Sequence, residues 1–258
     1  MIRTRRTALP ALALASAALF AVTGCTSDTG GSVSGGSGDS SGGGDGTAEP
    51  SAPVSGEAGS ALKTVGGLTV KGRAPRTGYD RERFGSAWAD TDSNNCRTRE
   101  DILKRDLDGV TFRDGKCVVV AGTLAEDPYT GERVEFERGR SEVDIDHLVA
   151  LSDAWQKGAQ QWPPRKRIAF ANDPLNLLAV DASTNRSKSD GDTATWLPPN
   201  KAFRCTYVAG QVAVKTKYRL WVTDAEKDAM RRVLSGCPEQ KLPTGGNPTE
   251  APARFTAR

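Results

Sequence analysis

The chain of 258 residues contains one histidine, His147, which lies in the segment EVDIDHLVAL at 142–151. Asp146 directly precedes it, and Asp144 lies two residues further back. An imidazole titrates near pH ~6.5, so it can accept a proton at neutral pH, while carboxylates bind hard cations. In an extended backbone the side chains of Asp146 and His147 point to opposite faces. Asp146 could therefore bind a metal while the His147 imidazole contacts a different part of the same site.

A second polar segment, NLLAVDASTNRSKSD at 176–190, follows downstream. It begins with Asn176, runs through an apolar strand, a turn and a return, and reaches Asn185. Arg186 and Lys188 then place positive charge beside the second asparagine, as a phosphate site requires. We interpret the two segments as halves of one site. The simpler alternatives are a turn role for Asn176 and solvated surface charge for Arg186 and Lys188.

Zinc is a poor candidate for the metal, because zinc sites favour several nitrogen and sulfur ligands. The chain has one histidine and no Cys-x-x-Cys pair, so oxygen ligands and a hard cation are expected. A second acidic stretch, with Asp90, Asp92 and Asn94, alternates like a calcium loop. It lacks the later glutamate of an EF-hand, which argues against calcium there.

The N-terminus has the features of an export signal. Basic residues at 3–6 precede an apolar run at 8–22 that is too short to span a bilayer. The run ends in VTGC at 22–25, which resembles a bacterial lipobox with Cys25 as the lipidated residue. We expect a signal peptide over 1–24 and a lipoprotein anchored through Cys25 to the outer face of the cytoplasmic membrane. An ordinary signal peptide and a secreted protein are the alternative.

Four further cysteines, an even number in an exported chain, predict two disulfides. They are Cys96, Cys117, Cys205 and Cys237. Proximity in the sequence favours Cys96–Cys117 and Cys205–Cys237, although three pairings are open.

Composition divides the rest of the chain into three parts. Residues 25–60 are mostly small and polar, which predicts a flexible tether, and 241–258 predict a disordered tail. The segment 61–240 has the size of one domain. From residue 61 onward the chain has 32 basic and 27 acidic residues, a mild excess that is compatible with a polyanionic partner.

Patterning within the domain predicts an α+β fold. A hairpin is expected over 109–124 around Asp114-Gly115, and a further strand over 130–139. The remaining expected elements are helices over 95–107, 198–220 and 223–236, and a strand or turn that becomes a helix over 145–162. Thr223 and Glu226 form a capping box at the start of the last helix, and Gly236 ends it.

The order DIDHLVAL, NDPLNLLAV and NRSKSD resembles the HNH nuclease motif of the ββα-metal fold. It is most similar to the secreted, GmrSD-like HNH endonucleases, and the same order occurs in HNH domains of RNA-guided DNA nucleases. The motif covers 146–190, and the segments 84–103 and 196–208 extend the resemblance. The third position is Asn185 instead of the histidine of the family name.

The resemblance implies a ββα-metal core with surrounding helices and a hairpin, and it implies a role for each site residue. His147 would be the general base, and Asn176 would fix the orientation of its imidazole. Asp146 and Asn185 would bind one divalent cation, Mg²⁺ first and Mn²⁺ second. Arg186 and Lys188 would contact substrate phosphate.

The resulting hypothesis is a monomeric, metal-dependent endonuclease that hydrolyses nucleic acid, with DNA favoured over RNA. The alternative is a non-catalytic, disulfide-stapled surface lipoprotein that binds an envelope polymer or a protein partner. A DNA-degradation assay with and without a chelator discriminates between the two.

Overall fold

A computed structural model describes residues 59–140 and 142–257 of the chain. The predicted signal peptide, Cys25 and all but the last two residues of the predicted tether lie outside the described residues. Within them no helix is long and apolar enough to cross a bilayer.

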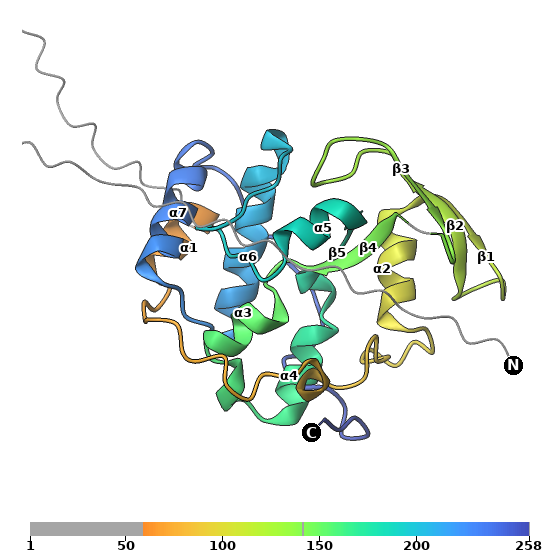
Figure 1. Cartoon of the computed structure of the whole chain (residues 1–258), viewed down its shortest axis with the longest axis horizontal. Coiled ribbons are helices and arrows are strands. Elements are labelled where there is room, and N and C mark those ends of the chain that lie inside the picture. Colours follow the sequence, from red (N-terminus) through yellow and green to blue (C-terminus); the bar gives the residue numbers. More distant parts are fainter. Residues whose placement is uncertain (1–58, 141, 258) are drawn as a thin grey trace, which may run out of the picture. The chain divides into compact units, whose positions relative to one another are not determined.

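In the part of the chain that the structure describes, five strands form two small antiparallel sheets (Figure 1). The first sheet has the order β1-β2-β3, made of β1 (Asp108–Phe112), β2 (Val119–Leu124) and β3 (Val134–Glu137). The second sheet pairs β4 (Val143–His147) with β5 (Leu177–Asp181). The strands predicted at the hairpin and over 130–139 are therefore confirmed.

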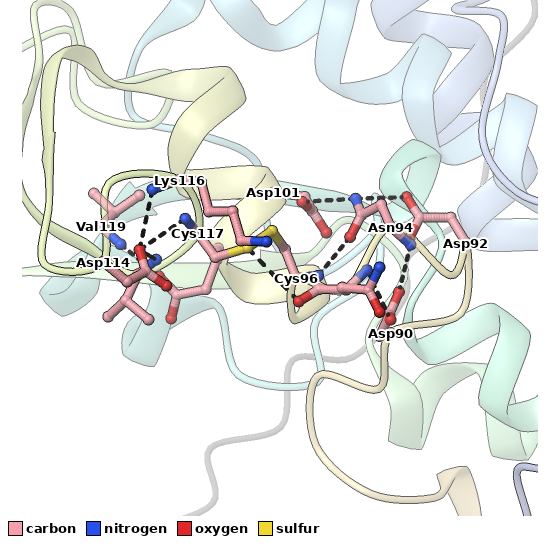
Figure 2. Close-up of a disulfide and its surroundings, with 12 residues drawn as sticks. Asp90, Asp92, Asn94, Cys96, Asp101, Asp114, Lys116, Cys117 and Val119 are labelled. Atoms are coloured by element: carbon pink, nitrogen blue, oxygen red, sulfur yellow. Dashed lines mark hydrogen bonds between the residues drawn. A yellow bond between two sulfur atoms is a disulfide. The ribbon is translucent and has the colours of Figure 1, made fainter.

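The hairpin turn between β1 and β2 is organised by one carboxylate. Asp114 accepts hydrogen bonds from the backbone N–H groups of Lys116, Cys117 and Val118 at 3.2, 2.9 and 2.8 Å. These donors hold the pKa of Asp114 at about 2. Gly115 takes the left-handed conformation that the turn needs, with φ +77°. A disulfide from Cys117 to Cys96 then ties the turn to the segment just before the helix α2 (Thr98–Asp106), which precedes β1 (Figure 2).

The second sheet continues directly into a short helix. In its register Asp144 lies opposite Val180, and His147 opposite Leu177. After β5 the chain forms α5 (Ala182–Lys188), whose first turn is capped by the Asp181 carboxylate on the N–H of Thr184. The expected apolar strand is confirmed as β5, but the turn and return expected up to Asn185 were wrong, because this cap starts a helix instead. The result is a β4-β5-α5 unit.

Helices cover the rest of the domain. They are α1 (Ala61–Gly66), α2 (Thr98–Asp106), α3 (Leu151–Gln156), α4 (Pro164–Ala171), α6 (Arg204–Tyr218) and α7 (Asp224–Ser235), with 3₁₀ turns at Arg81–Phe84, Ala159–Gln161, Pro174–Asn176 and Lys201–Phe203. The Thr223 half of the capping box before α7 is confirmed, since Thr223 accepts from the N–H of Glu226, but the Glu226 carboxylate pairs with Lys157 and Lys215 instead. The helix predicted over 198–220 begins only at Arg204, because Asn200 first caps the 3₁₀ turn Lys201–Phe203. The α+β class is confirmed.

The buried core has three main parts. Helices α1, α6 and α7 enclose one, with Tyr207 and Met230 fully buried (Figure 1). A second surrounds Trp155 and Phe170, and a third lies between α2 and the two sheets around Ile145. The second disulfide, Cys205–Cys237, links the start of α6 to the residue after Gly236. Both disulfides follow the pairing that proximity favoured.

Six charged side chains form a buried group that we call the ion cluster. Its members are Arg73, Asp153, Lys157, Asp192, Lys215 and Glu226. The Lys157 ammonium lies 2.7, 2.8 and 2.6 Å from Asp153, Asp192 and Glu226. Lys215 contacts Asp153 and Glu226 at 3.1 and 2.9 Å, and Arg73 contacts Asp153 and Asp192 at 3.0 and 2.6 Å. The three cations and three anions balance.

The C-terminal segment has a defined path, unlike the disordered tail that its composition predicts. Ala251 is buried and exchanges two hydrogen bonds with Arg165, at 3.1 Å to its carbonyl and 2.7 Å from its Nε. The N–H of Asn247 donates to Asp173 at 3.1 Å, and Arg254 donates to the carbonyl of Asp90 at 2.9 Å. These backbone and side-chain contacts offset the low apolar content of the segment.

Candidate active site

His147 is the last residue of β4, and only 7% of it is exposed. Its Nε2 lies 2.9 Å from the carbonyl oxygen of Ala171, at the end of α4. A carbonyl can only accept, so Nε2 carries the proton and Nδ1 is the basic nitrogen of the neutral ring. The backbone of α4 therefore selects the tautomer.

The surroundings keep this imidazole neutral. Burial lowers the pKa of His147 to about 3, against the opposing effect of the Ala171 carbonyl. The positive charges of Arg81 and Lys188 make smaller contributions to this lowering of the pKa. At pH 7 the ring is therefore in the form that can accept a proton.

Asp146 points to the other face of β4, as the alternation of a strand requires. Its carboxylate accepts hydrogen bonds from the Lys188 ammonium at 2.9 and 3.0 Å and from the Tyr129 hydroxyl. Burial and the charge of Asp146 raise the pKa of Tyr129 well above its usual value, so this phenol stays a donor. Two buried donors therefore orient the Asp146 carboxylate.

Lys188 has a different place from the one predicted for it. Its ammonium is fully buried and also donates to the carbonyl of His147 at 2.8 Å. It therefore ties α5 to the end of β4 and neutralises Asp146. This position leaves the ammonium inside the domain and away from a phosphate on the surface.

Asn176 also differs in detail from its expected role. Its Oδ1 accepts from the N–H of Val149 at 2.9 Å, and its Nδ2 donates to the carbonyl of Val149 at 3.3 Å. Its backbone carbonyl accepts from Leu148 at 2.8 Å. The side chain thus holds the backbone just after His147, and the imidazole itself is oriented by Ala171.

The remaining predicted residues lie together at a more open edge of the site. The Asn185 amide is 3.4 Å from a carboxylate oxygen of Asp144, so α5 and β4 bring these two side chains side by side. Arg186 lies 3.9 Å from the same oxygen, and its side chain is 71% exposed. This guanidinium is free to meet a phosphate from solvent.

The predicted metal ligands can be compared with what a divalent cation requires. Within residues 59–140 and 142–257, no three histidine, cysteine, aspartate or glutamate side chains gather in a way that could hold a metal. Asp146 and Asn185 are only two ligands, and Asp144 beside Asn185 adds a third oxygen donor. Oxygen donors of this type are the ligands that Mg²⁺ prefers, and Mg²⁺ also keeps several waters. A cation at Asp146 would share the carboxylate with Lys188.

A cavity of about 600 Å³ opens beside His147. Arg81, Phe84 and Trp88 line one side of it, Asn172 lies beside Ala171, and Thr256 comes from the C-terminal segment. The Trp88 ring is nearly parallel to the imidazole, at 13° with the centroids 6.1 Å apart. Trp88 was not among the site residues predicted from the sequence. Only the resemblance over 84–103 linked it to the site.

The acidic stretch that resembles a calcium loop makes its own turn (Figure 2). The Asp90 carboxylate accepts from the N–H groups of Asn94 and Asn95, both at 3.1 Å. The Asn94 amide bridges Asp92 and Asp101 at 3.1 and 3.0 Å. These carboxylates satisfy backbone and side-chain donors of the segment that leads to the first disulfide.

Comparison with known proteins places the chain in a family. Residues 97–233 match the model of the C-terminal domain of GmrSD restriction endonucleases, a range that contains every residue of the predicted motif. An uncharacterized secreted protein of Arthroderma benhamiae is 40% identical over 190 residues, which cover 73% of this chain and 90% of the relative. No solved structure matches the chain. The chain therefore belongs to the family of GmrSD restriction endonuclease C-terminal domains.

Proposed function

We propose that this protein is a metal-dependent endonuclease that hydrolyses phosphodiester bonds of nucleic acid, with His147 as its general base. The observation that carries the proposal is the state of this imidazole. It is neutral, its Nε2–H is fixed by the Ala171 carbonyl, and it forms a wall of a cavity. The β4-β5-α5 arrangement and the restriction endonucleases named in the family description support the same reaction.

In this proposal Nδ1 of His147 takes a proton from the attacking water as the new oxygen–phosphorus bond forms. The bond from phosphorus to the 3′ oxygen breaks, and the leaving oxygen acquires a proton from solvent. The negative phosphate raises the proton affinity of the buried ring when substrate is bound, which offsets its low pKa in the free protein.

Asp146 and Asn185, with Asp144 beside them, are the residues that would hold Mg²⁺ or Mn²⁺. When bound, the cation supplies positive charge for the phosphate and the leaving oxygen. Lys188 and Tyr129 keep the Asp146 carboxylate oriented toward one position. Arg186, on the open edge, would contact a phosphate next to the one that is cleaved.

We further propose that the protein acts outside the cytoplasm, on DNA in preference to RNA. The similar fungal protein is described as secreted, and the basic and apolar N-terminus is typical of export. Anchoring through Cys25 would keep the nuclease on the membrane surface.

The test is a cleavage assay on the purified Cys25→Ser protein, which lacks the lipid, with fluorescent DNA and RNA. Cleavage should need Mg²⁺ or Mn²⁺ and stop with EDTA. His147→Ala should lower kcat by roughly 10²- to 10⁴-fold while the circular dichroism spectrum stays unchanged. Arg133→Ala, at an exposed ion pair, is the matched control. Full activity in the His147→Ala protein would contradict the assignment, and an inactive wild type would favour the non-catalytic binding protein.

A further inference from the structure

We infer that the cavity beside His147 receives a single unpaired nucleotide, with its base against Trp88. The substrate would then be single-stranded nucleic acid, or a duplex at a position where one nucleotide can leave the stack. The inference rests on the proposed function and specifies its substrate.

The burial of the reacting group carries the first step. His147 is 7% exposed and lines the cavity, so a phosphate that reaches this base must enter the cavity. The phosphates of a duplex lie on the outside of a stiff rod, so bringing one of them into a cavity requires the duplex to bend or one nucleotide to leave the stack. A single strand can bend a phosphate into a cavity without that cost.

The lining of the cavity carries the second step. The half-buried Trp88 gives it an aromatic ring, and every base has a face that stacks on such a ring. Its volume of about 600 Å³ lies within the range of ~300–1,000 Å³ found for small-molecule sites. Arg81, whose charge is felt at His147, adds a cation at the same cavity for the phosphate.

Two local features point to a ligand at this place. Asn172 lines the cavity at 1% exposure, and its Oδ1 accepts no hydrogen bond from any residue that the structure describes. An amino group of a base is a donor that could satisfy it. Trp88 has φ +61°, which a bulky side chain rarely adopts, and such backbone strain is concentrated at functional sites.

The cavity is also closed from the side of the C-terminus. Thr256 and Ala257 belong to its lining, and the segment before them is fixed by Arg254 on the carbonyl of Asp90. The C-terminal segment therefore adds a fixed wall to the cavity, which a bound nucleotide would contact.

Binding can be measured apart from cleavage in EDTA, which removes the divalent cation. The fluorescence anisotropy of a labelled nucleic acid is followed as the Cys25→Ser protein is added. The probes are a labelled oligothymidylate and the same strand paired with oligoadenylate, at one fixed salt concentration. We expect the single strand to bind at least ~10-fold more tightly than the duplex. Equal affinity for the two probes would overturn the inference.

Substitution of Trp88 tests the stacking surface. Trp88→Ala should weaken binding of the single strand about 10-fold and leave the duplex unchanged, because stacking on one ring has an effect of this size. Trp88→Phe keeps a ring and should keep most of the affinity, so it covers the case in which the alanine variant unfolds. Trp221→Ala is the control, since that indole donates to Gly72 and is not part of the cavity lining. Unchanged affinity in both Trp88 variants would contradict the inference.

The two proposals can fail separately. A protein that binds the single strand as expected but never cleaves it refutes the nuclease assignment alone. A protein that cleaves single strands and duplexes at equal rates refutes the unpaired-nucleotide cavity alone.

Discussion

The ion cluster and the candidate active site both bury charged side chains, but their surroundings differ. Five of the six members of the ion cluster have side chains that are at most 3% exposed, and they neutralise one another. In the active site the Asp146–Lys188 pair is equally buried, yet His147 beside it borders a cavity. Asp144 and Arg186 nearby reach solvent.

The difference teaches that burial of charge alone does not mark a site of chemistry. A closed and balanced cluster positions elements, since Asp153 lies in α3, Lys157 directly follows α3, and Asp192 follows α5. It thereby fixes the helix after His147 against the helix that carries Asn185. An active site needs, in addition, a group that a substrate can reach. Substitutions and acid should therefore affect the ion cluster and the charges of the candidate active site differently.

Lys157→Met should lower the free energy of unfolding by about 3–5 kcal/mol, because it leaves buried carboxylates without their shared cation. Urea denaturation measures the loss. Arg133→Met removes an ion pair whose side chains are 63% and 65% exposed, and should change stability by less than ~0.5 kcal/mol. A loss under ~1 kcal/mol in Lys157→Met would mean that the ion cluster is not a structural centre.

Lys188→Met should also destabilise the protein, by roughly 3 kcal/mol in EDTA, since Asp146 then keeps only the Tyr129 hydroxyl as a donor. Here Mg²⁺ should recover part of the loss, because a cation can take the place of the ammonium at the carboxylate. Thermal melting with EDTA and with Mg²⁺ measures this recovery. The Lys157→Met protein should show none, and equal shifts in both variants would argue against a cation site at Asp146.

Acid should weaken the ion cluster in a defined window. Burial would raise the pKa of Asp192, but Lys157 and Arg73 hold it at about 2. A carboxyl whose folded pKa is below its unfolded value, roughly 3.9, adds stability above that value and loses it as the pH falls. Stability should therefore decline from about pH 4 to about pH 2. Asp192→Asn should show a shallower decline in chemical denaturation, and an unchanged slope would remove Asp192 as a cause.

Arg186→Ala should have the smallest effect on stability and binding. The side chain is 71% exposed, and its guanidinium comes no closer to the Asp144 carboxylate than 3.9 Å. We expect unchanged stability and a few-fold weaker binding of oligothymidylate at low salt. The plot of log affinity against log salt concentration should become less steep, by the contribution of about one phosphate contact. Identical salt slopes for wild type and variant would show that Arg186 does not touch the substrate.

Local signals in the sequence predicted the elements that depend on neighbouring residues. The Thr223 cap, the Asp114-Gly115 turn and the two disulfides between near cysteines all have causes within a short stretch of chain. The start of α5 was missed, because the Asp181 carboxylate in an otherwise strand-like run caps a helix. The Asp181 cap therefore decides whether the residues after β5 form a helix or a turn.

The candidate site could be predicted only in part. The order of Asp146, His147 and Asn185 was visible, but the tautomer depends on Ala171, which carries no side-chain chemistry at all. Lys188 looked like a phosphate ligand, because nothing near it in the sequence shows that its ammonium is buried against Asp146. Contacts between distant parts of the chain, such as Trp88 with His147, follow from packing alone.

The neutrality of the ion cluster also constrains how this protein can change over evolutionary time. Its charges cancel only as a complete set, drawn from segments between residues 73 and 226. Replacing any one member leaves a buried charge uncompensated, so an intermediate with a single replacement is selected against. Relatives should therefore carry either all six residues or a joint apolar replacement, and these six positions should covary more strongly than their distance along the chain suggests.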